Sequence, residues 1–156
     1  MNTMKNLFKV MSLLLLISCS GDYVEGSYVL EEEILTDLQS GLMWQRNTPE
    51  VFEGCTKGDN RSLCSWEEAV SYCENLVLED YSDWRVPTVD ELATLIQNDI
   101  NPSRIEGLFS LTPPKEFFWA AEENKTFFYP GGLYSDNWNN RDNLVRCVRG
   151  IPLADN

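Results

Sequence analysis

The sequence predicts an α+β domain in which two helices pack on a small antiparallel sheet with long irregular loops. Two segments have the apolar periodicity and capping residues of amphipathic helices, and short runs rich in β-branched and aromatic residues lie on both sides of them. Strands, helices and then further strands in this order are typical of the α+β class. With 156 residues, the chain has room for one such domain.

The first predicted strands flank the turn DLQSG. Ile34-Leu35 precedes this turn and Leu42-Met43-Trp44 follows it, and its Asp, Ser and Gly residues favour a tight reversal of the chain. The three glutamates at positions 31–33 are interpreted as a solvated strand edge rather than a metal site. These residues predict two short strands near the start of the domain.

The first predicted helix begins at Ser65. Ser65 and Glu68 have the spacing of a capping box, in which each side chain accepts a hydrogen bond from the backbone N–H of the other residue. An apolar stripe follows at helical spacing, formed by Trp66, Ala69, Val70, Cys73, Leu76 and Val77. Because Cys73 lies on that stripe, its thiol is predicted to point into the core.

The second predicted helix begins at Thr88, with Glu91 as its capping-box partner. Its buried face is predicted to consist of Val89, Leu92, Leu95 and Ile96. Pro87 restricts the residue before it to an extended conformation, so the segment DWRVPT is predicted to enter the helix like a strand. We interpret Trp84 and Arg85 in this segment as scaffold, with the arginine satisfying carbonyls or a carboxylate.

Three or four strands are predicted after the proline-containing loop SRIEGLFSLTPPKE. They lie at residues 117–121, 126–129, 133–138 and 144–149, and the turns EENK, PGG and NNRDN separate them. Short polar turns join consecutive strands in antiparallel order, so this part of the chain predicts an antiparallel sheet.

The N-terminus has the composition of a lipoprotein leader. Lys5 and Lys9 give a positively charged start, and a mostly apolar run follows at residues 10–17, which is too short to span a bilayer as a mature helix. The segment LISC, ending at Cys19, resembles the bacterial lipobox, in which the cysteine is acylated; an ordinary signal peptide containing a cysteine is the alternative. Two or three acyl chains hold a protein stably at a membrane. We therefore expect a signal peptide at residues 1–18, a lipidated tether at 19–27 and the domain at 28–152.

Composition excludes several functions. Cleavage after residue 18 removes two lysines and no acid, so the mature chain carries 10 Lys and Arg against 25 Asp and Glu, a net charge of −15. Such a surface repels nucleic acid and sulfated polysaccharide and favours cations or basic partners, or it simply keeps an exported domain soluble. Histidine is absent, which excludes histidine-dependent catalytic triads and histidine zinc sites. We expect no enzymatic activity.

Four cysteines remain when Cys19 is set aside. Cys55, Cys64, Cys73 and Cys147 allow three pairings, and an even number in an exported chain indicates disulfides. Spacing favours Cys55–Cys64, which closes a short loop, and Cys73–Cys147, which ties the first helix to the C-terminal strand. The chain-entropy model assigns these bridges about 3 and about 4.5 kcal/mol. A zinc site of four thiolates is the alternative, although no two of these cysteines are separated by only two residues.

Five blocks carry a resemblance to a known family: TDLQSGLMWQR, SWEEAVSYCENL, YSDWRVPTVDEL, FFWAA and LVRCVRG. In this order and spacing the chain resembles the Lcl C-terminal-like domain, an exported bacterial module, over residues 34–150. The resemblance implies a fold related to C-type lectins, in which a long irregular loop supplies the binding surface. It also implies a bridge between Cys73 and Cys147, whereas the loop closed by Cys55 and Cys64 resembles an insertion into the family's common core.

The family is associated with adhesion and ligand binding at cell surfaces, and some members recognise sulfated glycans. The net charge of this chain leaves no evident basic groove, so we do not expect sulfated-glycan binding here. The expected protein is a lipid-anchored component of the bacterial cell envelope with a lectin-like ligand-binding or adhesion module for a glycan or a protein. A structural or assembly subunit of an envelope protein complex is the alternative. Ser20 replaces the aspartate that often retains lipoproteins in the inner membrane, which favours the outer membrane if the source is Gram-negative.

Ligand recognition is predicted on the loop side formed by residues 100–116 and 130–143. Tyr134 and Trp138 have even spacing and would share one face of a strand, with Asn139 and Asp142 as polar partners. Trp138 lies outside the five blocks, which contain the other four tryptophans. The alternative is that Trp138 belongs to the core.

Calcium ligands are proposed in the same stretch, namely Asp136, Asn139, Asn140 and Asp142. Sugar-binding C-type lectins have a Trp-Asn-Asp motif in the corresponding strand region, whereas this chain has Trp138-Asn139-Asn140 and lacks the companion motif. A polar turn rich in Asn and Asp is the alternative interpretation. No other cofactor is expected.

Overall fold

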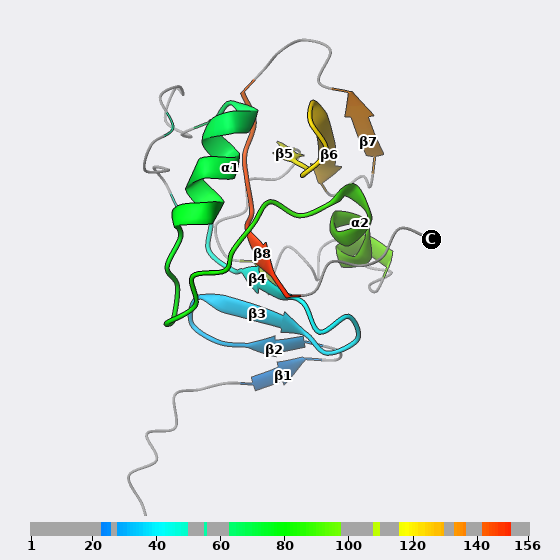
Figure 1. The fold of residues 1–156 in the computed structure, drawn as a ribbon. Coiled ribbons are helices and arrows are strands. Elements are labelled where there is room, and N and C mark those ends of the chain that lie inside the picture. The colour runs from blue at the N-terminus through cyan, green and yellow to red at the C-terminus, as the bar shows by residue number, and fades with distance from the viewer. Residues whose placement is uncertain are drawn as a thin grey trace, which may run out of the picture.

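The computed structural model describes residues 23–25, 28–49, 55, 63–97, 108–109, 116–129, 133–136 and 142–150. Two antiparallel sheets and two helices make up this part of the chain (Figure 1). The five-stranded sheet has the order β1-β2-β3-β4-β8, and the three-stranded sheet has the order β5-β6-β7. The predicted α+β class is therefore confirmed, and the arrangement is consistent with a C-type-lectin-like fold.

The elements have the following bounds. The strands are β1 Tyr23–Glu25, β2 Tyr28–Leu30, β3 Ile34–Asp37, β4 Met43–Gln45, β5 Glu116–Trp119, β6 Lys125–Tyr129, β7 Leu133–Asp136 and β8 Val148–Arg149. The helices are α1 Trp66–Asn75 and α2 Val89–Gln97. Within the described ranges, neither helix has the length and apolar character needed to cross a membrane.

The predicted hairpin around DLQSG is confirmed as β3 and β4. The Asp37 carboxylate accepts hydrogen bonds from the Gln39 N–H at 2.9 Å and from the Ser40 hydroxyl at 2.8 Å. Gly41 has a φ of 74°, a left-handed conformation that glycine adopts without steric cost. Local hydrogen bonds of Asp37 therefore fix the reversal that the sequence predicted.

Two segments before this hairpin differ from expectation. Residues 23–25, expected within the tether, form β1 and pair with β2 in the register Tyr23↔Leu30; their aromatic and β-branched residues suit a strand. Residues 31–33, expected at a strand edge, instead form the turn between β2 and β3, where the Glu31 N–H donates to the Ile34 carbonyl at 2.9 Å. The domain thus begins closer to Cys19 than the sequence indicated.

Residues 142–149 connect the two sheets. Asn143 exchanges backbone hydrogen bonds of 3.0 Å with Cys64, and the next residue, Leu144, bonds to β5. Further along, Val148 pairs with β4 and exchanges backbone hydrogen bonds of 2.9 Å with Arg85. The single strand predicted at 144–149 is therefore wrong over most of its length, because the backbone changes partners from β5 to β4 and only Val148–Arg149 joins a strand ladder.

Both helices begin as predicted. The capping box of Ser65 and Glu68 is present at α1, and Thr88 and Glu91 exchange the equivalent hydrogen bonds at the start of α2, at 2.9 and 3.2 Å. Helix α1 ends at Asn75, two residues before the predicted stripe ends, so Val77 lies outside the helix with 68% of its surface exposed. The predicted position of Val77 in the core is therefore wrong.

Tryptophans fill much of the core, as the scaffold interpretation predicted. Trp44, Trp84 and Trp119 are buried, and the Trp119 indole N–H donates to the Cys64 carbonyl at 2.7 Å. Trp66 is half-buried and its indole N–H donates to the Ala120 carbonyl at 3.0 Å. The Trp119 indole thus joins β5 to Cys64, two residues before α1, and the Trp66 indole joins α1 to the residue after β5.

The predicted disulfide pairing is confirmed. Cys55 is bonded to Cys64, and Cys73 is bonded to Cys147. Cys73 and Cys147 are both fully buried, as the position of Cys73 on the apolar stripe of α1 predicted. The second bridge therefore fixes α1 to the segment that joins the two sheets.

Candidate functional site

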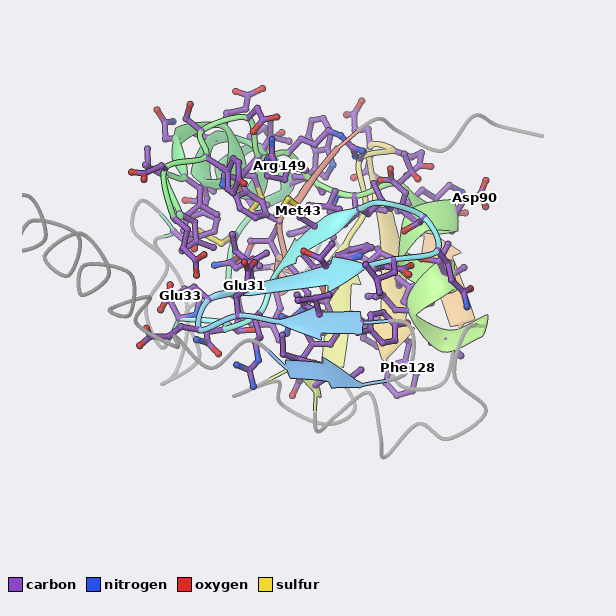
Figure 2. The ribbon with its side chains drawn as sticks, turned by 90° about the horizontal axis from the view of Figure 1, so that it is seen from below. Glu31, Glu33, Met43, Asp90, Phe128 and Arg149 are labelled. Carbon is purple, nitrogen blue, oxygen red and sulfur yellow. A yellow bond between two sulfur atoms is a disulfide. The ribbon has the colours of Figure 1, made fainter. Side chains whose placement is uncertain are left out.

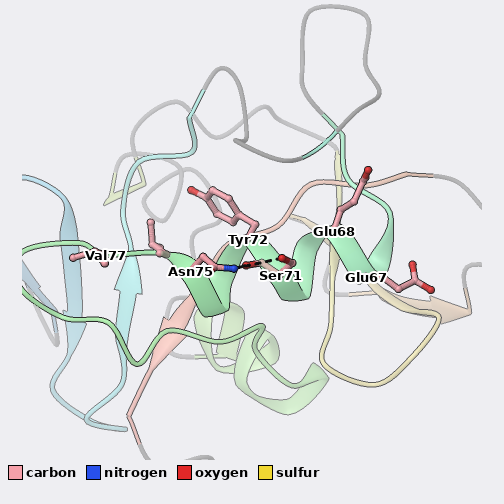
Figure 3. A pocket seen from close by; sticks show the side chains of 7 residues that line it. Glu67, Glu68, Ser71, Tyr72, Asn75 and Val77 are labelled. Atoms are coloured by element: carbon pink, nitrogen blue, oxygen red, sulfur yellow. Dashed lines mark hydrogen bonds between the residues drawn. The ribbon is translucent and has the colours of Figure 1, made fainter.

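An open groove of about 620 Å³ runs along the outer side of α1 (Figure 3). Its described lining consists of Glu67, Glu68, Ser71, Tyr72, Asn75, Leu76 and Val77. All of these residues belong to α1 or to the two residues that follow it. The described part of the lining therefore comes from one helix and the two residues after it, and a capping box and a buried disulfide hold this helix in place.

Helical spacing explains how this lining forms. Glu68, Ser71, Tyr72 and Asn75 are three or four residues apart, so their side chains follow one another along one stripe of α1. This stripe lies beside the stripe of Ala69 and Cys73, which is buried against the core. One helix thus supplies both a core face and an adjacent polar face.

Tyr72 contributes an aromatic ring and a hydroxyl that is fixed in position. The Gln45 side-chain amide donates to the Tyr72 hydroxyl at 2.8 Å. Burial is the largest cause that raises the pKa of Tyr72, the hydrogen bond from Gln45 lowers it, and the negative charge of Glu33 raises it further. The net direction is upward, so the pKa of Tyr72 keeps the phenol neutral at neutral pH.

The polar side chains of the groove are held by hydrogen bonds within α1. The Asn75 amide donates to the Ser71 carbonyl at 2.8 Å, and the Glu68 carboxylate accepts from the Ser65 N–H at 2.8 Å. Glu67 and Ser71 are exposed. Carboxylate, hydroxyl and amide groups together with an aromatic ring can hydrogen-bond and stack against a polar ligand.

At its C-terminal end, the groove meets a tight hairpin. Leu78 and Tyr81 exchange two backbone hydrogen bonds of 3.0 Å, and the residues between them, Glu79 and Asp80, have φ values of 48° and 69°. Positive φ at both central positions is the geometry of a type I′ turn, which favours Asn and Gly. The Glu79 carboxylate accepts from the Glu33 N–H at 3.1 Å, so the hairpin is tied to the turn between β2 and β3.

A cation–π contact braces the same hairpin against β8. The Arg149 guanidinium lies 3.8 Å from the centre of the Tyr81 ring and donates to both carboxylate oxygens of Asp83, at 2.7 and 3.1 Å. This hydrogen bonding is the largest cause that lowers the pKa of Asp83, and it raises the pKa of Arg149. Both groups therefore stay charged at neutral pH, and the exposed Val77 immediately precedes this fixed hairpin.

The structure places only part of the ligand site that the sequence predicted. Tyr134 lies in β7, opposite Phe127 in the register, and Asp142 is half-buried at the start of the segment that joins the sheets. Asp136 is exposed at the end of β7 and forms an ion pair with Lys125. Trp138, Asn139, Asn140 and Cys19 lie outside the described residues. The predicted site and the predicted calcium ligands thus remain predictions.

No group of three or more His, Cys, Asp or Glu side chains suited to a metal ion occurs among the residues that the structure describes. The described calcium candidates are Asp136 and Asp142, and Asp136 already has a cationic partner in Lys125. The groove on α1 is the candidate site whose lining lies within the described residues.

Reasoning from the sequence missed the α1 groove. The periodicity of residues 66–77 was used to find the buried stripe, and a polar stripe on a helix ordinarily faces only solvent. The signal that could have found the groove is Tyr72, an aromatic residue on the polar side of the helix, next to Ser71 and one turn after Glu68. An aromatic side chain beside hydroxyl and carboxylate groups is typical of a binding surface.

A family model of the Lcl C-terminal domain matches residues 33–149. This range contains both helices and the six strands β3 to β8, whereas β1 and β2 precede it. Neither a curated protein nor a solved structure matches the chain.

Proposed function

The chain belongs to the Lcl C-terminal domain family, and from this premise we propose that it is a lipid-anchored protein of the bacterial cell envelope whose domain binds a ligand in adhesion. The lectin-like role rests on likeness of fold and on the groove described above. We propose no catalytic activity for it.

Cysteine chemistry supports export and anchoring. The four internal cysteines form two disulfides, which persist in oxidising compartments outside the cytoplasm. Cys19 is the one cysteine of the sequence that has no place in these bridges, and it ends the segment LISC. A thiol at this position of a lipobox is the acceptor of the acyl chains, so Cys19 is the proposed point of attachment to the membrane.

The groove on α1 is the observation that carries the binding role. Its helix is fixed by the Cys73–Cys147 bridge at its buried side, so the groove exists before the ligand arrives and little order has to be gained on binding. The lining combines Tyr72, Ser71, Asn75 and Glu67 with the exposed Val77. This mixture suits the hydroxyl and amide groups of a neutral glycan or of a polar protein segment.

Charge limits the choice of ligand. The mature chain carries a net charge of −15 once residues 1–18 are removed, and the described lining of the groove contains Glu67 and Glu68 but no lysine or arginine. Nucleic acids and sulfated glycans would be repelled from such a surface. The proposed ligand is therefore a neutral glycan or a protein. We retain Tyr134, Trp138, Asn139 and Asp142 as a second proposed contact region.

An assembly subunit of an envelope complex is the second candidate function. It is favoured by Phe117 on β5, which has 41% of its surface exposed and whose ring centre lies 5.0 Å from that of Phe128 on β6. Exposed aromatic side chains of this kind act as anchors in protein interfaces. A partner on this sheet would be a protein rather than a glycan.

A binding experiment with matched variants tests the groove. We would compare the wild-type domain, Ser71→Arg and Glu74→Arg on a glycan array and in pull-downs from solubilised envelope. Ser71→Arg fills the groove, whereas Glu74 is exposed on the same helix but does not line the groove. Glu74→Arg changes the net charge more than Ser71→Arg does, so it controls for charge.

Loss of binding by about tenfold or more, equivalent to about 1.4 kcal/mol, in Ser71→Arg alone supports the groove. Equal binding of all three proteins rejects it.

In that case Trp138→Ala and Tyr134→Ala test the second region: lost binding at an unchanged melting temperature supports a site there. A fall in melting temperature without a specific effect on binding assigns these residues to the core. Loss of the pull-down partner in Phe117→Ser alone favours the assembly subunit.

A further inference from the structure

β1 begins very close to the proposed lipid anchor. Only Ser20, Gly21 and Asp22 separate Cys19 from Tyr23, the first residue of β1. A fully extended chain covers at most about 3.6 Å per residue, so Tyr23 lies within about 14 Å of the lipidated residue. An anchor of this length keeps the N-terminal end of β1 at the bilayer surface.

The order of the strands then fixes which parts of the domain lie farther from the anchored strand β1. β1 is one edge of the five-stranded sheet and β8 is the other. Neighbouring strands are about 4.8 Å apart, so four intervals place β8 about 19 Å from β1. The three-stranded sheet joins the molecule beyond β4 and β8, through the bonds of β5 to Leu144. Figure 1 accordingly shows β1 and the β5-β6-β7 sheet at opposite ends of the domain.

The turn between β2 and β3 lies at the anchored end of β1. Tyr23 is opposite Leu30, the last residue of β2, so residues 31–33 follow directly at that end of the sheet. Figure 2 shows Glu31 and Glu33 together at one end of these strands, with Phe128 and Asp90 toward the other. This acidic turn and the end of β1 form one corner of the molecule.

We propose that the anchor holds the protein in one orientation, with the β1 edge and the turn at residues 31–33 against the lipid headgroups and the three-stranded sheet pointing away from the membrane. This inference rests on the lipid anchoring proposed above. In this orientation the bilayer surface is the partner of the β1 edge. The three residues between Cys19 and Tyr23 are too short a tether for the domain to turn over. The predicted contact region around β7 would then face ligands outside the membrane.

Energy transfer in vesicles tests the orientation. The lipidated full-length protein is reconstituted into phosphatidylcholine vesicles that contain a lipid with an acceptor dye on its headgroup. A donor dye is attached to Glu32→Cys in the turn or to Asp136→Cys at the end of β7; both native side chains are exposed. The internal cysteines are bridged and Cys19 carries lipid, so the introduced thiol is the one that reacts.

The expected result is transfer from position 32 that exceeds transfer from position 136 severalfold. A control protein carries about 20 Gly and Ser residues inserted before Tyr23, a segment with a root-mean-square length of about 25 Å, and its two positions should give nearly equal transfer. Equal transfer with the native tether, in protein that floats with the vesicles, overturns the orientation but leaves the anchor intact. Protein that does not float with the vesicles overturns the anchor and the orientation together.

Discussion

Arg85 joins the segment before α2 to α2 itself and to β8. Its guanidinium donates to both carboxylate oxygens of Glu91, at 2.8 and 2.6 Å, and its backbone exchanges hydrogen bonds with Val148. Glu91 is fully buried and also accepts the capping hydrogen bond from the Thr88 N–H. The interpretation of Trp84 and Arg85 as scaffold is therefore confirmed, with a carboxylate as the partner of the arginine.

The two members of this pair should differ in their effect on stability. Arg85→Met leaves a buried carboxylate without its guanidinium, and we expect the free energy of unfolding to fall by about 3 kcal/mol or more. Glu91→Gln should cost less, about 1 to 2 kcal/mol, because the amide still accepts the capping bond and the Arg85 side chain, 27% exposed, can be hydrated. Urea unfolding at neutral pH measures both. Equal losses would contradict this account.

Asp80 offers a substitution that should stabilise the protein. It has a φ of 69° in the turn after α1, and a left-handed backbone costs an L-residue other than glycine about 1 kcal/mol. Asp80→Gly should raise the free energy of unfolding by about that amount. Ser82→Gly is the matched control, since Ser82 is exposed and has no positive φ, and it should leave stability unchanged or lower it. A lower melting temperature for Asp80→Gly would rule out this explanation.

At the scale of elements, the two disulfides should contribute unequally. Removing Cys73–Cys147, which spans 74 residues, should cost about 4.5 kcal/mol, and removing Cys55–Cys64, which spans 9 residues, about 3 kcal/mol. Serine at Cys73 and Cys147 also buries two hydroxyls, since both positions have no exposed surface. Thermal unfolding of the two double serine variants under non-reducing conditions measures the difference. An equal or larger loss for the short loop would reverse the ranking.

Local signals were enough to predict most elements. Ser65 with Glu68 and Thr88 with Glu91 located both helix starts, because a capping box depends only on residues three positions apart. The β3–β4 hairpin followed from the side-chain hydrogen bonds of Asp37 in the same way. The disulfides followed because an even number of cysteines in a chain expected to be exported indicates bridges, and spacing favoured one pairing.

The misassigned segments depend on partners far away in the sequence. Residues 144–149 divide their backbone bonds between β5 and β4, and no local pattern reveals such a change of partner. Residues 23–25 lie in a stretch, residues 20–27, that is small and polar overall, and they become a strand because β2 supplies a ladder. The groove on α1 was not predicted for a related reason. The polar face of a helix can be recognised from the sequence, but the hollow beside it depends on the tertiary structure.

At the scale of the whole molecule, the proposed anchor gives a direct prediction. Cys19→Ala should release the protein from membranes or leave it unprocessed, because the acceptor thiol for the acyl chains is absent. Fractionation of cells that express each form measures the release, and Cys55→Ser with Cys64→Ser controls for the loss of cysteine as such. Mass spectrometry that finds residues before Cys19 on the mature wild-type protein would refute the lipobox.

If the protein is exported as proposed, the bridge that residues 142–149 build between the sheets also decides when it becomes folded. An exported chain emerges with its N-terminus first, so this segment emerges after both helices and strands β1 to β7. Until then β4 and β5 lack the segment that bonds to both of them, and the disulfide between Cys73 and Cys147 cannot form. We expect the Cys55–Cys64 loop to be able to close early and the core to close in one late step. A chain that stops short of residue 142 would then meet the proteases of the envelope unfolded.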